Sequence, residues 1–175
     1  MKKFLFFVLL TVLAVSRPVF AGPQQSIEIA FSPDAGATDS IVRLISEAKH
    51  TIRVAAYSFT SKDIAAALLN AHKHGIDVQV VLDKSNAKAK YSSATFLANV
   101  GVPTRINYKY AIMHSKFMVV DEVTVETGSF NYTKAAEQKN AENVIILRNY
   151  PDIAAKYQKE WQKLWNEAQD YQARY

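Results

Sequence analysis

Residues 113–131 carry side chains that could together bind and cleave a phosphate ester. His114 offers an imidazole that can act as a nucleophile, and Lys116 places a positive charge two residues later. Ser129 and Asn131 repeat this spacing with a hydroxyl and an amide. Hydrolysis of a phosphodiester without a metal needs a nucleophile, positive charge near the phosphoryl oxygens and a proton for the leaving oxygen. The residue types in this segment therefore indicate phosphoryl chemistry.

A β-hairpin is needed to bring these side chains together. Residues 116–120 and 123–127 are rich in β-forming side chains and flank Asp121 and Glu122, which predicts two strands joined by a two-residue turn. Seven residues of strand separate Asp121 from His114, about 23 Å, and an odd separation places their side chains on opposite faces. We therefore expect Asp121 to lie outside the reacting group and to hold the turn.

The hairpin sets which side chains face each other. Alternate residues of a strand point to one face, so His114 and Lys116 share a face. With a two-residue turn, Lys116 lies opposite Thr127, and His114 lies opposite Ser129. Asn131 follows near the start of a predicted helix, where free backbone N–H groups favour an anion. The hairpin thus gathers an imidazole, an ammonium, a hydroxyl and an amide on one small surface that suits a tetrahedral phosphate.

The rest of the sequence predicts alternating strands and helices, as in an α/β domain. Strands are expected at residues 26–31, 51–59, 77–83, 104–107 and 143–147. Helices are expected from Thr38 or Asp39 to about Lys49, after Ser61 up to Gly75, from Ser92 or Ser93 to Gly101, and from Pro151 onward. In the last helix aromatic residues recur at helical spacing, which is typical of a face that packs on a core. We therefore expect one layered domain, a mixed β-sheet flanked by α-helices.

Residues 1–21 have the pattern of a cleavable signal peptide. Paired lysines near the start precede a run of twelve residues, 4–15, that is apolar except for Thr11. A membrane-spanning helix needs about 20 apolar residues, so this run is too short to be an anchor. We expect cleavage between Ala21 and Gly22, export to the periplasm or the medium, and no stable membrane association afterwards.

The composition indicates one globular domain over residues 22–175. Of the 175 residues, 49% are hydrophobic and 21% are charged, which excludes a disordered or collagen-like protein, and the absence of Cys excludes a disulfide scaffold. The formal net charge is +5, but three of the 21 basic residues and no acidic residue lie in the first 21 positions. The domain is therefore close to neutral, and any attraction to phosphate must be local.

Nothing in the sequence indicates a metal or a cofactor. His72 and His74 are two positions apart near the end of a predicted helix, whereas a helical metal-binding pair is spaced by four. They and His50 are better placed to interact with helix dipoles. No cluster of acidic residues with metal-ligand spacing accompanies residues 113–131. Lys116 would supply the charge that a metal ion would otherwise bring.

The pattern His-x-Lys-x4-Asp-x6-Gly-Ser-x-Asn resembles the signature of the phospholipase D superfamily. It is formed by His114, Lys116, Asp121, Gly128, Ser129 and Asn131. From average residue usage, the whole pattern would arise by chance in about one chain in a million of this length, so the match is specific. A short exported chain with one copy of the pattern and an Ala-Glu-Asn-Val strand at 141–144 resembles the small bacterial periplasmic endonucleases of that superfamily.

The resemblance implies a phospholipase D-like fold and a metal-independent reaction through a phosphohistidine. His114 would attack phosphorus, and Lys116, Ser129 and Asn131 would hold phosphoryl oxygens. It also implies an acid at Glu142, which would orient the imidazole; without the resemblance, a solvent-facing acid at the end of a strand fits equally well. Members carry two copies of the signature, in one long chain or across a homodimer. A single copy therefore implies a homodimer with a shared active site.

We expect an exported, metal-independent phosphodiesterase that acts as a non-specific endonuclease on DNA or RNA. Basic and tyrosine side chains beside the signature could follow a polyanion and stack on bases, although a solvated loop has the same composition: Lys84, Lys88, Lys90, Tyr91, Arg105, Tyr108, Lys109 and Tyr110. One alternative is a phospholipase D acting on lipid head groups, which should expose an apolar loop or an interfacial helix near the site. Another alternative is a non-catalytic nucleic-acid binder, which would need no nucleophile at His114.

Overall fold

The computed structural model describes residues 24–89 and 92–173. The predicted signal peptide, residues 1–21, lies outside the described residues, as do Lys90 and Tyr91 of the basic loop. In the two described ranges, no helix is long and apolar enough to cross a membrane.

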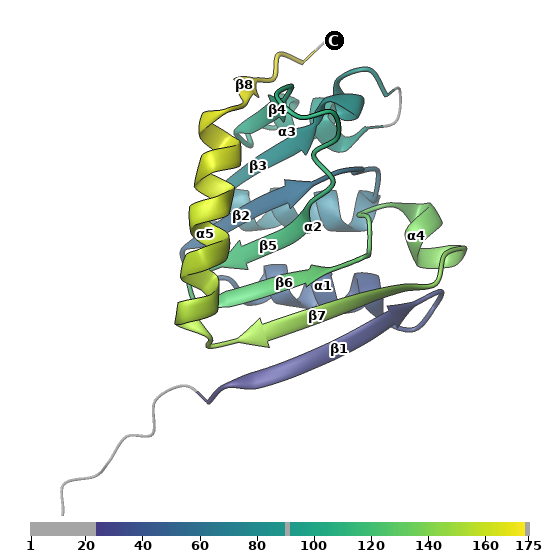
Figure 1. Ribbon diagram of the computed structural model, residues 1–175, viewed down its shortest axis with the longest axis vertical. Coiled ribbons are helices and arrows are strands. Elements are labelled where there is room, and N and C mark those ends of the chain that lie inside the picture. Colours follow the sequence, from purple (N-terminus) through teal and green to yellow (C-terminus); the bar gives the residue numbers. More distant parts are fainter. Residues whose placement is uncertain (1–23, 90–91, 174–175) are drawn as a thin grey trace, which may run out of the picture.

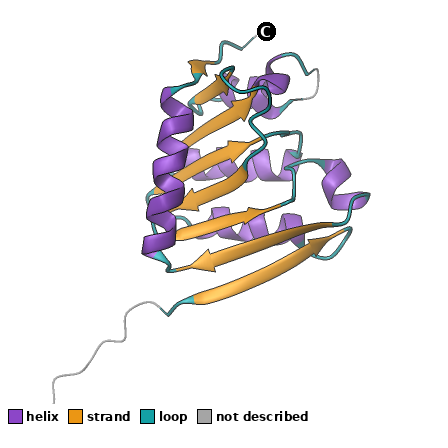
Figure 2. Cartoon of the chain, in the orientation of Figure 1, coloured by secondary structure: helices purple, strands orange, loops and turns teal. Residues whose placement is uncertain are grey.

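Within the described residues, eight strands form one sheet with helices on both faces (Figures 1 and 2). The strands are β1 (Ser26–Ser32), β2 (Thr51–Ala56), β3 (Asp77–Asp83), β4 (Thr104–Asn107), β5 (Lys116–Val120), β6 (Thr124–Gly128), β7 (Glu142–Arg148) and β8 (Gln169–Asp170). The helices are α1 (Ala37–Glu47), α2 (Lys62–Lys73), the 3₁₀ helix η1 (Lys84–Ala87), α3 (Ser93–Asn99), α4 (Lys134–Gln138) and α5 (Pro151–Asn166). The strand order is β1-β7-β6-β5-β2-β3-β4-β8, with β2, β3 and β4 parallel and the other pairings antiparallel. The predicted α/β domain with a mixed sheet is confirmed.

Different helices cover the two faces of the sheet. α1, α2 and α3 pack on one face, and α5 crosses the other (Figure 1). α5 is anchored by Trp161, which is 1% exposed and donates from Nε1 to the carbonyl oxygen of Val54 (2.9 Å). The apolar side of the last helix therefore packs on the core, as its spacing predicts.

Two helix starts show where a local prediction holds and where it fails. Ser61 caps α2, as predicted, by accepting a hydrogen bond from the backbone N–H of Ile64 (3.3 Å). α1 instead begins after Gly36 with no side-chain cap. Thr38 donates its hydroxyl and its backbone N–H to the Glu137 carboxylate (2.5 and 3.0 Å). Glu137 lies 99 residues later, in α4, so no local pattern reveals this contact.

The hairpin of β5 and β6 is present, but its turn holds one more residue than predicted. Asp121 and Glu122 adopt left-handed conformations (φ 51° and 59°), and the Val123 N–H donates to the Val120 carbonyl oxygen (3.2 Å), which closes a tight turn. Pairing then starts between Val120 and Thr124, so Val123 is an additional residue in the loop. Val123 continues the apolar pattern of the strand that follows, which is why the sequence does not show the insertion.

The additional residue shifts the register and corrects two predicted pairs. Phe117, not Lys116, lies opposite Thr127. A shift of one residue turns a side chain to the other face of the sheet, so Thr127 shares a face with Phe117 and α5. Ser129 does not face His114 across the hairpin; its backbone N–H and its hydroxyl both bond to β7 (3.1 Å each).

Candidate active site

The signature residues gather at one end of the sheet. β5 begins there with Lys116, β6 ends there with Gly128, and β7 begins there with Glu142. Because these strands are antiparallel neighbours, the start of one lies beside the end of the next. The end of β2 joins them, since Ala56 pairs with Lys116. Four segments that are far apart in the sequence thus surround one position.

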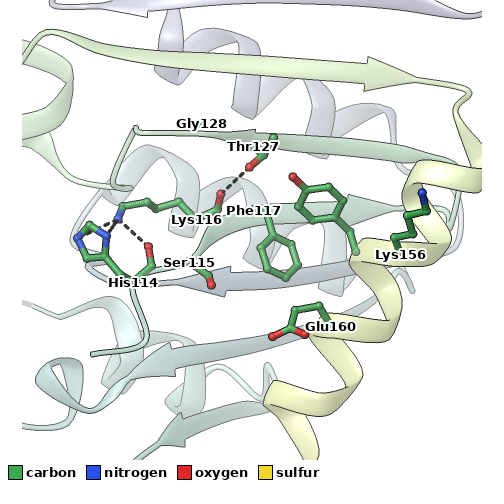
Figure 3. A pocket seen from close by; sticks show the side chains of 9 residues that line it. His114, Ser115, Lys116, Phe117, Thr127, Gly128, Lys156 and Glu160 are labelled. Atoms are coloured by element: carbon green, nitrogen blue, oxygen red, sulfur yellow. Dashed lines mark hydrogen bonds between the residues drawn. The ribbon is translucent and has the colours of Figure 1, made fainter. Parts of the chain in front are cut away.

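His114 and Lys116 form the centre of this site and point toward each other (Figure 3). The Lys116 Nζ lies 2.9 Å from His114 Nδ1 and 3.1 Å from Nε2, and it donates to the His114 carbonyl oxygen (2.8 Å). Because an ammonium only donates, a ring nitrogen that accepts from it carries no proton, as a nucleophile requires. Burial lowers the pKa of Lys116, and the negative charge of Glu142 opposes that effect. An imidazole and a buried ammonium therefore lie within reach of one phosphate.

Tyr57 is a member of the site that the sequence analysis missed. β2 ends at Ala56, not at residue 59 as predicted, so Tyr57 leaves the sheet at the site. Its ring centroid lies 4.7 Å from that of His114 and 5.3 Å from the Lys116 Nζ. An aromatic face favours a nearby cation and restricts the imidazole. The feature of the sequence that could have identified Tyr57 is its position directly after a buried parallel strand, where ligand-binding groups tend to lie.

The segment that carries Ser129 and Asn131 is tied to β7. The carbonyl oxygen of Asn143 accepts from the backbone N–H groups of Ser129 and Phe130 (3.1 and 3.4 Å). The Ser129 Oγ accepts from the Asn143 N–H (3.1 Å) and keeps its own proton for another acceptor. The side-chain Oδ1 of Asn131 is buried and has no hydrogen-bond partner in the described part of the chain. Because phosphoryl oxygens accept hydrogen bonds, Asn131 could bind one only through the N–H groups of Nδ2 and not through Oδ1.

Glu142 lies near Lys116 but is not bonded to the imidazole within one chain. Its Oε1 accepts from the Asn140 side-chain amide (3.1 Å). The negative charge of Glu142 raises the pKa of Lys116, so the two groups interact electrostatically. The expected contact between Glu142 and His114 is therefore not made among the described residues of a single chain.

Asp121 lies at the opposite end of β5 from His114, as its spacing predicts. Its carboxylate accepts hydrogen bonds from three consecutive backbone N–H groups, those of Lys49, His50 and Thr51 (2.8, 2.7 and 2.9 Å). Its own N–H donates to the Thr51 carbonyl oxygen (2.9 Å). Asp121 therefore joins the hairpin turn to the start of β2 and reaches no reacting group.

Glu126 and Tyr132 are a second pair that the sequence analysis missed. Both are buried, at 1% and 0% exposure, and the Tyr132 hydroxyl donates to Glu126 Oε2 (2.5 Å). The carbonyl oxygen of Tyr132 accepts from Thr60 and Ser61 (2.8 Å each), which ties it to the start of α2. Since Glu126 and Tyr132 flank the segment with Ser129 and Asn131, their bond closes a loop that holds this segment in place. The signal available in the sequence was an acid in the middle of the predicted strand 123–127.

Replacement of Glu126 by Gln should remove a pH dependence of stability. Burial raises the pKa of Glu126 to about 7, against the opposing effect of the Tyr132 hydrogen bond. A folded-state pKa above the ordinary value of 4.5 means that stability falls as pH rises from about 4.5 to 7 and then levels off. The loss is about 3 kcal/mol at about 1.4 kcal/mol per pH unit.

Urea unfolding of wild type and Glu126→Gln at pH 5 and pH 8 measures this effect. The variant keeps an acceptor for Tyr132, so it should gain stability relative to wild type at pH 8. Glu122→Gln, an exposed acid in the turn, is the control and should follow wild type. The same pH dependence in Glu126→Gln as in wild type would rule out Glu126 as its source.

Among the described residues, no group of three or more His, Asp or Glu side chains could hold a metal ion. His74 Nδ1 lies 2.8 Å from the Asn70 carbonyl oxygen, one turn earlier at the end of α2, which is the helix-end position expected for it. The positive charge beside the imidazole of His114 is that of Lys116.

The sequence matches known relatives across the site. The family profile described as "Cardiolipin synthase, PLD-like domain" matches residues 41–165. A phospholipase D of Rickettsia typhi is 36% identical over 138 residues, which are 79% of this chain and 67% of that protein. A mitochondrial cardiolipin hydrolase of Xenopus laevis is 35% identical over 134 residues, 77% of this chain and 63% of that protein.

Two solved structures have the same fold. Nuc from Salmonella typhimurium, a phospholipase D family member, aligns with a TM-score of 0.83 and 42% identity over 85% of this chain and 99% of that chain. NucT from Helicobacter pylori aligns with a TM-score of 0.76 and 25% identity over 85% of this chain and 100% of that chain. Fold, signature and relatives agree: the chain belongs to the phospholipase D superfamily and is a hydrolase that acts on phosphodiester bonds.

Proposed function

We propose that this protein is an exported nuclease that cleaves DNA or RNA without a metal ion, through a phosphohistidine at His114. The observation that carries the proposal is the pairing of His114 with the buried ammonium of Lys116 (2.9 Å). The likeness to Nuc and NucT, over 85% of this chain and 99% and 100% of theirs, supports nucleic acid as the substrate. The pattern of residues 1–21 supports export.

Each side chain has a step in this reaction. The unprotonated ring nitrogen of His114 attacks phosphorus, so that an N–P bond forms and the bond to the leaving oxygen breaks. Lys116, Asn131 and the Ser129 hydroxyl stabilise the charge on the phosphoryl oxygens. Water then attacks phosphorus and gives a proton to the group that protonated the leaving oxygen, the N–P bond breaks, and His114 is restored with release of the phosphate product.

A second imidazole is needed to protonate the leaving oxygen. Attacking and leaving groups lie on opposite sides of phosphorus, so one ring cannot serve both. Among the described residues, His50, His72 and His74 lie near the starts of β2 and β3, at the other end of the sheet. A two-fold homodimer would present the same patch twice and bring a second His114 to the site.

A homodimer with one shared site should form at most one phosphohistidine per two chains. Acid quenching during turnover of a labelled diester, followed by mass spectrometry, gives the label per chain, and light scattering gives the mass of the active species. One label on every chain, or a fully active monomer, would contradict the shared site.

Nucleic-acid cleavage should continue at an unchanged rate in EDTA, because Lys116 supplies the positive charge at phosphorus. The purified mature protein is incubated with plasmid DNA and with RNA, with and without EDTA. A magnesium-dependent nuclease in the same buffers is the control that must lose activity. Loss of cleavage in EDTA that Mg²⁺ restores would refute the proposed mechanism.

A phospholipid substrate is the second candidate, and one observation favours it. Ile112, in the loop that leads to His114, is an apolar side chain that is 56% exposed, on a surface where we expected lysine and tyrosine. Apolar side chains of this kind can enter a membrane surface. Phosphatidylcholine vesicles added to the EDTA assay separate the candidates. Choline release without nucleic-acid cleavage supports the lipid, and binding of DNA without any cleavage supports a non-catalytic binder.

A further inference from the structure

A groove of about 430 Å³ leads away from His114 along β5 and β6 to α5 (Figure 3). One wall is made by the signature hairpin, with Phe117 and Thr127, and the other by α5, with Lys156 and Tyr157. The register shift described above is what turns Thr127 toward this groove. The reaction proposed for a single phosphate uses only the end of the groove at His114.

The groove has an exposed ammonium at its α5 end and aromatic rings along it. Lys156 lies at that end, whereas the Lys116 ammonium points away from Phe117 toward His114, on the other face of the sheet (Figure 3). Phe117 and Tyr157 meet edge to face, with ring centroids 5.1 Å apart. An exposed ammonium beside an aromatic ring is the combination that binds the phosphates and bases of single-stranded nucleic acid.

The charge of Lys156 is free for a ligand. Its side chain is exposed, and no carboxylate among the described residues pairs with it. Glu160 is the acidic residue that lines the groove, and it is paired with Lys163 (3.2 Å between Nζ and Oε1). The α5 end of the groove therefore holds the Lys156 ammonium, which no carboxylate of the described residues pairs with, and the Glu160 carboxylate, which is paired with Lys163.

We propose that this groove binds the nucleotides that flank the scissile phosphate, with Lys156 at a backbone phosphate and Tyr157 against a sugar or base. The inference rests on the proposed nuclease function and names the surface that extends the site beyond one phosphate. It makes Lys156 a residue that distinguishes a nucleic acid from a small diester, because a small diester does not reach α5.

Lys156→Ala and Lys159→Ala are the matched pair that tests the groove. Both lysines are exposed on α5, but Lys159 does not line the groove and lies against a different surface. Their kcat/KM values are measured on a labelled single-stranded oligonucleotide at several salt concentrations and on bis(p-nitrophenyl) phosphate. Circular dichroism checks that both variants fold.

Lys156→Ala should lose about tenfold in kcat/KM on the oligonucleotide at low salt, with a salt slope smaller by about 0.7 to 1, as for one lost phosphate contact. It should keep the wild-type rate on the small diester. Lys159→Ala should match wild type on both substrates, and Lys156→Arg should restore oligonucleotide cleavage.

Three outcomes would overturn the inference. Wild type that cleaves the oligonucleotide, with Lys156→Ala and Lys159→Ala equally active, rejects the groove alone and leaves the nuclease proposal standing. A loss in Lys156→Ala on phosphatidylcholine vesicles but not on the oligonucleotide makes the occupant a lipid. Wild type that cleaves no nucleic acid rejects the proposed function and the groove together.

Discussion

His114→Ala should abolish turnover, by at least about 10⁴-fold, and leave the fold intact. The imidazole is the nucleophile of the proposed reaction, and its ring packs on Tyr57 at the surface of the site, not in either apolar core. The rate is measured on plasmid DNA and on a small diester, at a temperature where circular dichroism shows a folded protein.

Asp121→Ala is the matched variant within the same signature. It should lose stability but keep its activity. It removes the acceptor for three backbone N–H groups, a loss of about 2 to 4 kcal/mol in stability at the usual strength of bonds to a charged group. Where the variant is folded, its rate should approach that of wild type. A well-folded Asp121→Ala that is as inactive as His114→Ala would show that Asp121 takes part in catalysis.

Gly128→Ala should destabilise the protein by about 3 kcal/mol or more and reduce activity with it. A Cβ at this position would lie 2.1 Å from the Asn143 carbonyl oxygen and 2.9 Å from its carbon. The strand β7 would have to move away from β6. That movement breaks the bonds that hold the Ser129 segment and displaces Glu142 at the start of β7.

Gly75→Ala separates this steric effect from the loss of a glycine as such. Gly75 has a φ of 84° but no atom within 4 Å of an added Cβ, so its replacement costs only the left-handed strain, about 1 to 2 kcal/mol. Urea unfolding measures both variants, and kcat/KM at a folding temperature measures the site. Equal losses of stability, with full activity in Gly128→Ala, would mean that β7 accommodates the methyl group.

The elements whose signals are local could be predicted from the sequence. β3 and β4 have the predicted bounds, and Ser61 caps α2 as predicted. Alternation of apolar residues and a capping hydroxyl act within a few positions, so a single segment carries the whole signal. For the same reason the spacing of His114 and Lys116 was enough to place their side chains together.

The contacts between segments that are far apart in the chain could not be predicted from the sequence, because they depend on how whole elements pack. Tyr57 reaches His114 from the end of another strand, and Lys156 reaches the groove from the last helix. The register of the hairpin depends on one residue, Val123, that looks like its neighbours in the sequence. These arrangements are set by the packing of whole elements that has the lowest free energy. A short stretch of sequence does not show which of the alternative packings that is.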